Sequence, residues 1–156
     1  MERFILEKLL DWKLSPHRKP LIVKGVRQVG KTWALKEFGK RHYENTVYVN
    51  FDELIFDEAQ DCPSVINSLK YFYENAPQYH VVCAGSLLGI ALAKPSSFPV
   101  GKVNFLQMDP MTFSEFLVAN GDETLVRYMQ ALETIGPIPE AFFNPLYEKL
   151  KMYYIT

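Results

Sequence analysis

The sequence predicts a three-layer α/β protein, with a mostly parallel sheet, helices on its faces and a helical C-terminal segment. Short apolar runs alternate with longer segments in which apolar residues recur at helical spacing. A glycine-rich turn also follows the first apolar run directly and opens one of the helical segments. Strands that alternate with helices in this way are typical of parallel sheets.

Composition fits one soluble globular domain. The chain has 156 residues, 48% of them hydrophobic, and a formal net charge of -1, so no overall charge draws it to nucleic acid or to an acidic membrane. No apolar stretch reaches the roughly 20 residues that span a bilayer, and we expect a cytoplasmic protein without membrane contact. Cys62 and Cys83 match no metal-binding spacing, and Cys83 lies in an apolar run typical of a core position.

The spacing of apolar residues predicts the helices and strands, and proline and glycine residues indicate where they end. The first helix should end before Pro16, and the helix that begins at Lys31 should end near Gly39. The expected strands cover residues 21–23, 47–51, 54–56, 79–84 and 103–108. The expected helices cover residues 2–13, 31–39 and 63–77, and three more begin at Thr112, Asp122 and Pro139.

The first apolar run leads into the pattern G-x-x-x-x-G-K-[ST], the signature of a phosphate-binding P-loop. Glycines admit backbone conformations that are closed to other residues, so successive N–H groups can curl around phosphates at the start of a helix. Lys31 would hold the β and γ phosphates of ATP, and the Thr32 hydroxyl would bind Mg²⁺. The expected nucleotide-binding residues are Gly25, Val26, Arg27, Gln28, Val29, Gly30, Lys31, Thr32 and Trp33.

An acidic pair ends the apolar run at residues 54–56, at the sheet edge where doubly wound folds bind ligands. Asp57 is suited to hold Mg²⁺ through water, and Glu58 could orient or deprotonate the attacking water. Ser86 follows the run at residues 79–84 and is a candidate sensor of the γ-phosphate or of that water. It could equally cap a helix that begins at Leu87.

These three elements, with the linking residues 97–103 and 110–117, resemble a family of predicted prokaryotic AAA+ ATPases. The resemblance spans most of the chain and implies an ATP-binding core, with Lys31, Thr32, Asp57, Glu58 and Ser86 in the roles given above. Members of that family couple the core to a C-terminal domain, which makes a partner domain or self-association an expected property. We divide the chain accordingly into a P-loop core at residues 1–110 and a helical extension at residues 111–156, the start of a lid region that looks truncated.

Only Asp52 and Glu53 separate the expected strands at residues 47–51 and 54–56. Parallel neighbours need a crossover of roughly a dozen residues or more, and Asp-Glu is poor hairpin chemistry. We therefore expect a helical segment to be missing at this point.

Few residues offer an arginine finger, the cation that neutralises charge on the γ-phosphate. Arg27 lies inside the P-loop, whereas Arg127 suits a solvated helix surface, and we assign neither to the role. A basic cluster could touch a nucleic acid backbone, although a solvated edge is the commoner reason for such a cluster; it comprises His17, Arg18, Lys19 and Lys24. The aromatic run at residues 71–73 could stack on bases, but the spacing of Phe72 from Val65 and Leu69 favours core packing.

Three functions remain open at this level. The leading hypothesis is Mg²⁺-dependent ATP hydrolysis that drives or gates a partner domain or an assembly. The second is a nucleotide-binding switch with little turnover. The third is a small-molecule kinase, which the Asp57–Glu58 pair disfavours because a water-activating glutamate suits hydrolysis.

Overall fold

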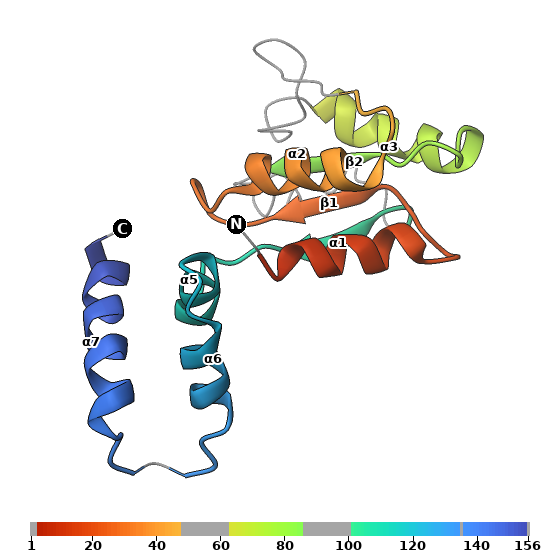
Figure 1. Cartoon of the computed structure of the whole chain (residues 1–156). Helices are drawn as coiled ribbons and strands as arrows, with labels where there is room; N and C mark the ends of the chain where they lie inside the picture. Colours follow the sequence, from red (N-terminus) through yellow and green to blue (C-terminus); the bar gives the residue numbers. More distant parts are fainter. Residues whose placement is uncertain (1–2, 48–62, 86–100, 135, 156) are drawn as a thin grey trace. The chain divides into compact units, whose positions relative to one another are not determined.

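A computed structural model describes residues 3–47, 63–85, 101–134 and 136–155, and of residues 63–67 only the backbone. The chain divides into two compact units. The core unit comprises residues 5–110, and the helical unit comprises residues 1–4 and 111–156. Figure 1 gives the element labels.

The described strands of the core unit form a parallel three-stranded sheet in the order β2-β1-β3. Strand β1 covers Leu21–Lys24, β2 covers Val82–Gly85 and β3 covers Asn104–Gln107. The central strand β1 pairs with β2 on one side and with β3 on the other. Its apolar residues are buried because they lie in the middle of a sheet with both faces covered. The α/β class and the parallel sheet are thus confirmed; β1 is one residue longer than expected, whereas β2 and β3 are each two residues shorter.

Helices α1 (Ile5–Leu14) and α2 (Lys31–His42) pack against one face of this sheet (Figure 1). The third described helix of the unit, α3, covers Pro63–Asn75. The apolar face of α1 contacts Leu21 and Val23 of β1 and the apolar face of α2. Together they form the larger hydrophobic cluster of the described residues. Its members are Ile5, Leu6, Leu9, Trp12, Leu21, Val23, Val29, Ala34, Phe38, Ala84 and Met108.

Gly39 does not end α2, contrary to the sequence-based expectation. The helix continues for three more residues to His42. A Cβ added at Gly39 would lie 2.8 Å from Thr46 Cγ2, so this glycine makes room for the returning chain. A glycine chosen for close approach and one chosen to end a helix look alike in a sequence.

The helical unit contains α5 (Phe113–Ala119), α6 (Glu123–Gln130) and α7 (Glu140–Ile155). All three were expected, and each begins within one residue of its predicted start. Its small core joins Leu117, Leu125 and Val126 to half-buried neighbours that include Phe142 and Leu146 of α7. Helix α7 passes through Pro145 without ending, although a proline inside a helix removes one backbone hydrogen bond.

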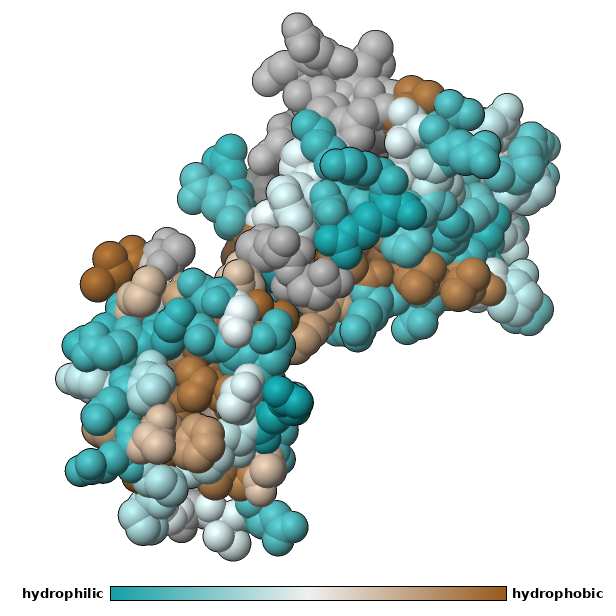
Figure 2. All heavy atoms as spheres, viewed as in Figure 1, coloured by the Kyte–Doolittle hydropathy of each residue, from teal (hydrophilic) through white to brown (hydrophobic). Residues whose placement is uncertain are grey.

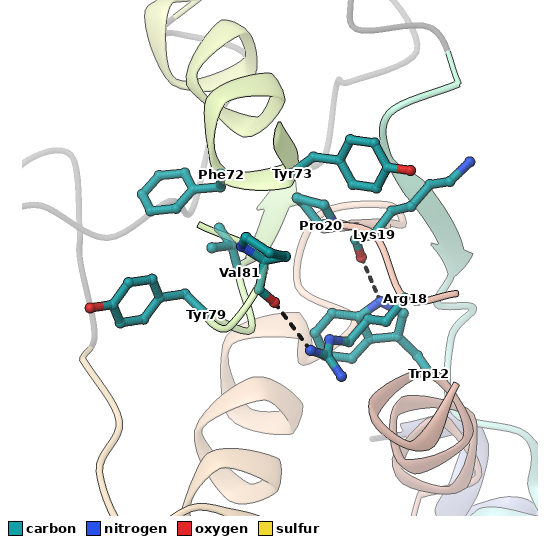
Figure 3. Close-up of a pocket in the computed structure, with 9 residues that line it drawn as sticks. Trp12, Arg18, Lys19, Pro20, Phe72, Tyr73, Tyr79 and Val81 are labelled. Atoms are coloured by element: carbon teal, nitrogen blue, oxygen red, sulfur yellow. Dashed lines mark hydrogen bonds between the residues drawn. The ribbon is translucent and has the colours of Figure 1, made fainter. Parts of the chain in front are cut away.

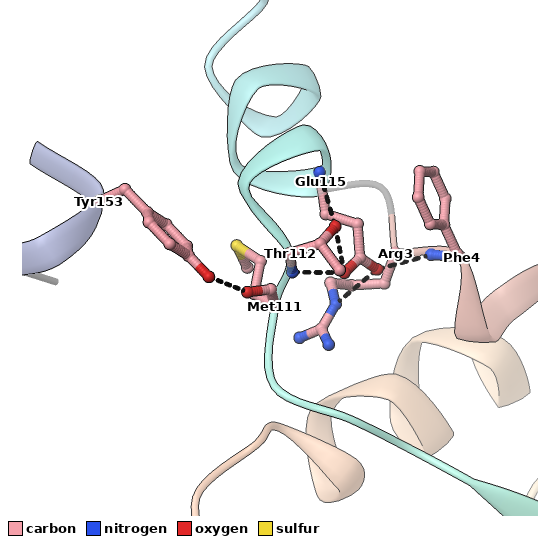
Figure 4. Close-up of polar contacts among 6 residues, drawn as sticks. All are labelled: Arg3, Phe4, Met111, Thr112, Glu115 and Tyr153. Carbon is pink, nitrogen blue, oxygen red and sulfur yellow. Dashed lines mark hydrogen bonds and ion pairs between the residues drawn. The ribbon is translucent and has the colours of Figure 1, made fainter. Parts of the chain in front are cut away.

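A carboxylate clamp holds the start of α5. The Glu115 carboxylate accepts hydrogen bonds from Arg3 Nε at 3.0 Å, from the Phe4 N–H at 2.9 Å and from the Thr112 N–H at 2.9 Å (Figure 4). Thr112 in turn accepts from the Glu115 N–H, which completes a capping box. The Tyr153 hydroxyl of α7 donates to the Met111 carbonyl at 2.6 Å. Polar contacts therefore hold residues 3–4 and the last turn of α7 close to the start of α5.

The expected strands at residues 47–51 and 54–56 fall almost wholly outside the described residues, as does the proposed missing segment between them.

Candidate functional site

The P-loop occupies the carboxyl edge of the sheet. Lys24, the last residue of β1, is in register with Gly85 of β2 and Gln107 of β3. Because the strands are parallel, all three end at one edge, and the chain leaves β1 there to form the loop before α2. The fold thus positions residues 25–30 where ligands bind in open α/β sheets.

Gly25 is required for space. A Cβ on this residue would lie only 2.3 Å from the carbonyl oxygen of Met108, which follows β3. Its φ is not positive, so the expectation that Gly25 provides an unusual backbone conformation is wrong. The neighbouring strand sets the need, since the Met108 N–H also donates to the Lys24 carbonyl at 2.7 Å. Sequence reasoning missed Met108, because nothing in the residue type signals a backbone contact.

The expectation of a special backbone conformation holds for Gly30. This residue has φ 88 and ψ 23, in the left-handed region, and it is the N-cap of α2 without a side-chain capping hydrogen bond. Gln28 also has a positive φ of 63, a conformation that costs a residue with a Cβ about 1–2 kcal/mol. These two residues turn the chain sharply into the helix. Such turns of successive N–H groups, at the positive end of a helix, form anion-binding sites.

Lys31 is fixed at the mouth of the loop. Its ammonium group donates to the Gly25 carbonyl at 3.0 Å and to the Val26 carbonyl at 2.8 Å, and the residue is buried. These contacts hold a positive charge beside the loop backbone, where it would attract a phosphate. The lysine is therefore placed by the fold before any ligand contributes.

The other loop residues divide by exposure. Val26, Arg27 and Gln28 are exposed, whereas Val29 is buried in the core cluster. Thr32 is half-buried in the first turn of α2, where a hydroxyl suits Mg²⁺. Trp33 packs against the hydrophobic cluster, so its contribution to the site is to anchor the start of the helix.

The remaining predicted site residues, Asp57, Glu58 and Ser86, lie outside the described residues. Ser86 directly follows Gly85, the last residue of β2. Within the described part of the chain, no group of three or more His, Cys, Asp or Glu side chains could hold a metal ion. The loop nevertheless fits a Mg-nucleotide, because it offers a helix start without a capping side chain, a positioned lysine and the Thr32 hydroxyl.

Two side predictions are confirmed. Cys83 is a buried core residue, and burial raises the pKa of its thiol to about 12, which leaves it unreactive. Arg127 is exposed in the last turn of α6. Cys62 falls outside the described residues.

The basic cluster is not a single patch. Arg18 and Lys19 precede β1, whereas Lys24 ends it and places its Nζ 3.8 Å from the centre of the Phe105 ring. These residues are close in the sequence, but the length of β1 separates Arg18 and Lys19 from Lys24.

A parallel sheet with flanking helices and a glycine-rich loop that places a lysine at a helix start define the P-loop NTPase type of α/β protein. A family model described as an AAA domain matches residues 17–55 and 52–117, well over half of the chain. The chain therefore belongs to the AAA domain family, as the sequence resemblance predicted, and its function at a coarse level is that of a nucleotide-binding, ATPase-like protein.

The two matched stretches overlap at residues 52–55, beside the link of two residues described above. Neither the search of curated proteins nor the search of solved structures found a match. Among the described helices, none combines the length and the apolar character needed to cross a membrane.

Proposed function

We propose that this protein binds Mg-ATP through the P-loop and hydrolyses it to drive or gate a partner domain or an assembly. The observation that carries the proposal is the placement of Lys31, which the carbonyls of Gly25 and Val26 hold beside the turn at Gly30. An ammonium fixed in this way, with helix N–H groups next to it, favours a polyphosphate over a single weak anion.

The sheet also limits where the acidic pair can act. Both sides of β1 are already paired, with β2 and with β3. A strand that ends in Asp57 and Glu58 would therefore join the sheet beyond one of these neighbours, and its carboxyl end would still reach the edge that carries the P-loop. In that position Asp57 would hold Mg²⁺ through water, with Thr32 as a direct ligand, and Glu58 would activate the attacking water.

The test is steady-state phosphate release in the presence of Mg²⁺. Lys31→Ala and Glu58→Gln should each reduce release at least tenfold, in line with typical losses of charged or acid–base groups. Lys40→Ala is the matched control, since Lys40 is an exposed lysine on the same helix, and it should match the parent. Equal rates in all four proteins would contradict the assigned chemistry.

A second candidate is a nucleotide-binding switch with little turnover. It is favoured by the break in the family match at residues 52–55, just before the acidic pair. That break also supports our proposal that a helical segment is missing there. ATP binding without measurable phosphate release in the parent protein would favour the switch over the hydrolase.

A further inference from the structure

The amino edge of the sheet, opposite the P-loop, gathers basic side chains from separate parts of the sequence. The three strands begin in register at Leu21, Val82 and Asn104, so the residues just before them share this edge. Arg18 and Lys19 precede β1, and Lys102 precedes β3. We call this group, with Tyr73 and Tyr79, the amino-edge patch; Figure 3 shows Arg18, Lys19, Tyr73 and Tyr79.

Backbone acceptors hold two of these basic groups in place. Arg18 donates through Nη1 to the Lys13 carbonyl at 3.1 Å and through Nη2 to the Pro77 carbonyl at 3.4 Å. Lys19 Nζ donates to the Gly101 carbonyl at 2.7 Å. Side chains that are positioned in advance lose less conformational entropy when they bind a ligand than freely rotating surface lysines do.

The backbone beneath the patch is fixed as well. Trp12 Nε1 donates to the Lys19 carbonyl at 2.8 Å, and Trp12 is itself buried in the core. Lys102 pairs with Glu74 at 3.3 Å. The patch therefore rests on the folded core of the unit.

Aromatic rings stand among these cations. The ammonium groups of Lys19 and Lys102 lie 6.0 and 5.3 Å from the centre of the Tyr73 ring. Tyr79 is 63% exposed and lines the same shallow hollow as Arg18 and Lys19. Tyr71, on α3 as well, is 65% exposed. The expectation that the aromatic run is mainly core packing is therefore wrong for Tyr71, and it holds only in part for Phe72, which is half-buried.

The local charge is positive although the whole chain carries a net charge of -1. Of these three cations, Lys102 pairs with a carboxylate, that of Glu74, whereas Arg18 and Lys19 donate to backbone carbonyls. His80 precedes β2 at the same edge, and burial lowers its pKa, as do the charges of Arg18 and Lys13. A neutral His80 leaves the positive charge of the patch to its arginine and lysines.

We propose that the amino-edge patch binds single-stranded nucleic acid, with backbone phosphates at Lys19, Lys102 and Arg18 and a base stacked on Tyr79. Charge alone would fit any polyanion. Tyr73, whose ring lies beside two of the lysines, and the exposed Tyr79 on the same hollow favour unpaired bases, which offer flat faces for stacking, over an acidic peptide. This surface lies at the other edge of the sheet from the P-loop, so the inference does not depend on ATP binding.

The test is fluorescence anisotropy of a labelled oligothymidylate, titrated with the full chain at low and at moderate salt. Lys19→Glu and Lys102→Glu should each weaken binding about tenfold at low salt, and both should flatten its salt dependence. Tyr79→Ala should weaken binding about fivefold or more through lost stacking. Lys8→Glu is the matched control, because Lys8 is an exposed lysine of α1 outside the patch.

Binding at the amino-edge patch should be separable from binding at the P-loop and from loss of folding. Lys31→Ala should bind the oligonucleotide like the parent, even if ATP binding is lost. Lys19→Gln, which removes charge without reversing it, guards against a folding defect, and intrinsic tryptophan fluorescence should match the parent in every variant. The proposal is overturned if the parent does not bind, if Lys8→Glu weakens binding as much as Lys19→Glu, or if Tyr79→Ala has no effect and poly-glutamate competes as well as oligothymidylate.

Discussion

The internal contacts that stabilise the core unit differ from those that stabilise the helical unit. In the core unit, Leu21, Ile22 and Val23 of β1 are at most 1% exposed, and α1 and α2 cover Leu21 and Val23. In the helical unit, the 16-residue helix α7 has no buried residue. Apolar side chains of α7, among them Tyr147 and Tyr154, are exposed, and apolar side chains are visible on the surface of this unit in Figure 2.

This difference assigns different stabilising forces to the two units. Burial of apolar surface, at about 25 cal/mol per Å², dominates in the core unit and gives the P-loop a rigid platform. The helical unit relies more on specific polar contacts, such as the Glu115 clamp and the ion pair between Lys149 and Asp122 at 2.7 Å. Substitutions of core apolar residues and of clamp residues should therefore act on separate units.

Tryptophan fluorescence can follow the core unit separately from the helical unit. Both of its tryptophans, Trp12 and Trp33, lie in the core unit. Tryptophan fluorescence therefore follows unfolding of that unit alone, whereas far-ultraviolet circular dichroism follows the helices of both. Two transitions that do not coincide would show that the units unfold independently.

The largest effect is expected in the core unit, from Leu9→Ala. Leu9 is fully buried between α1 and β1, so the substitution leaves a cavity and should cost about 2–5 kcal/mol of unfolding free energy. Urea titration followed by tryptophan fluorescence measures this loss. Leu14→Ala, at a residue that is 71% exposed on the same helix, should change stability by less than about 0.5 kcal/mol. Similar losses in the two variants would contradict the assignment of the core.

The next effect tests the clamp of the helical unit, through Glu115→Gln. Burial by itself raises the pKa of Glu115, but hydrogen bonds from Thr112 and Phe4, with the Arg3 guanidinium, outweigh burial and lower it. Loss of these charge-assisted bonds should cost about 1.5–3 kcal/mol near neutral pH. The helical signal in circular dichroism should shift more than the tryptophan signal does.

The lowered pKa of Glu115 also fixes the direction of the pH dependence. A carboxyl group whose pKa is lower in the folded state stabilises the fold above its unfolded pKa, of about 4.3. That stabilisation is lost as the pH falls through the folded pKa. The gap between the parent and Glu115→Gln should therefore narrow in acid. A gap that is constant down to strongly acidic pH would show that charge plays no part in the clamp.

The smallest effect compares two glycines, one in each unit. Gly25→Ala forces a methyl group against the Met108 carbonyl, and we expect a loss of about 1–3 kcal/mol from overpacking. Gly136→Ala meets nothing within 4 Å and has no positive φ, so it should be neutral or stabilise by up to about 1 kcal/mol. Thermal unfolding of the two variants decides the matter. Equal losses would mean that the contact between Gly25 and Met108 is not formed.

Sequence reasoning went furthest where one residue type has one physical use. The run of Leu, Ile and Val before a glycine-rich turn predicted a buried strand, and the helix after that turn begins at Lys31 as expected. It did less well where a residue type has several uses. Gly39 lies inside a helix and Gly25 serves close approach, because the neighbours that decide this, Thr46 and Met108, come from other parts of the chain.

Residues that only the sheet brings together were also missed. Lys102 and Tyr79 join Lys19 at the amino edge because β1 pairs with both β2 and β3. In the sequence, the nearer Lys24 looked like the natural partner of Lys19, but one strand length separates them. Pairing between strands is a long-range property, and local patterns do not encode it.

The central claim is that the P-loop binds Mg-ATP and that the fold positions Lys31 for this purpose. The most direct measurement is isothermal titration of the protein with ATP and Mg²⁺, alongside Lys31→Ala and the control Lys40→Ala. We predict saturable binding by the parent and by Lys40→Ala, and affinity at least about tenfold weaker for Lys31→Ala, as expected for the loss of hydrogen bonds to a charged ligand. Absence of binding by the parent, or equal affinity in Lys31→Ala, would contradict the claim.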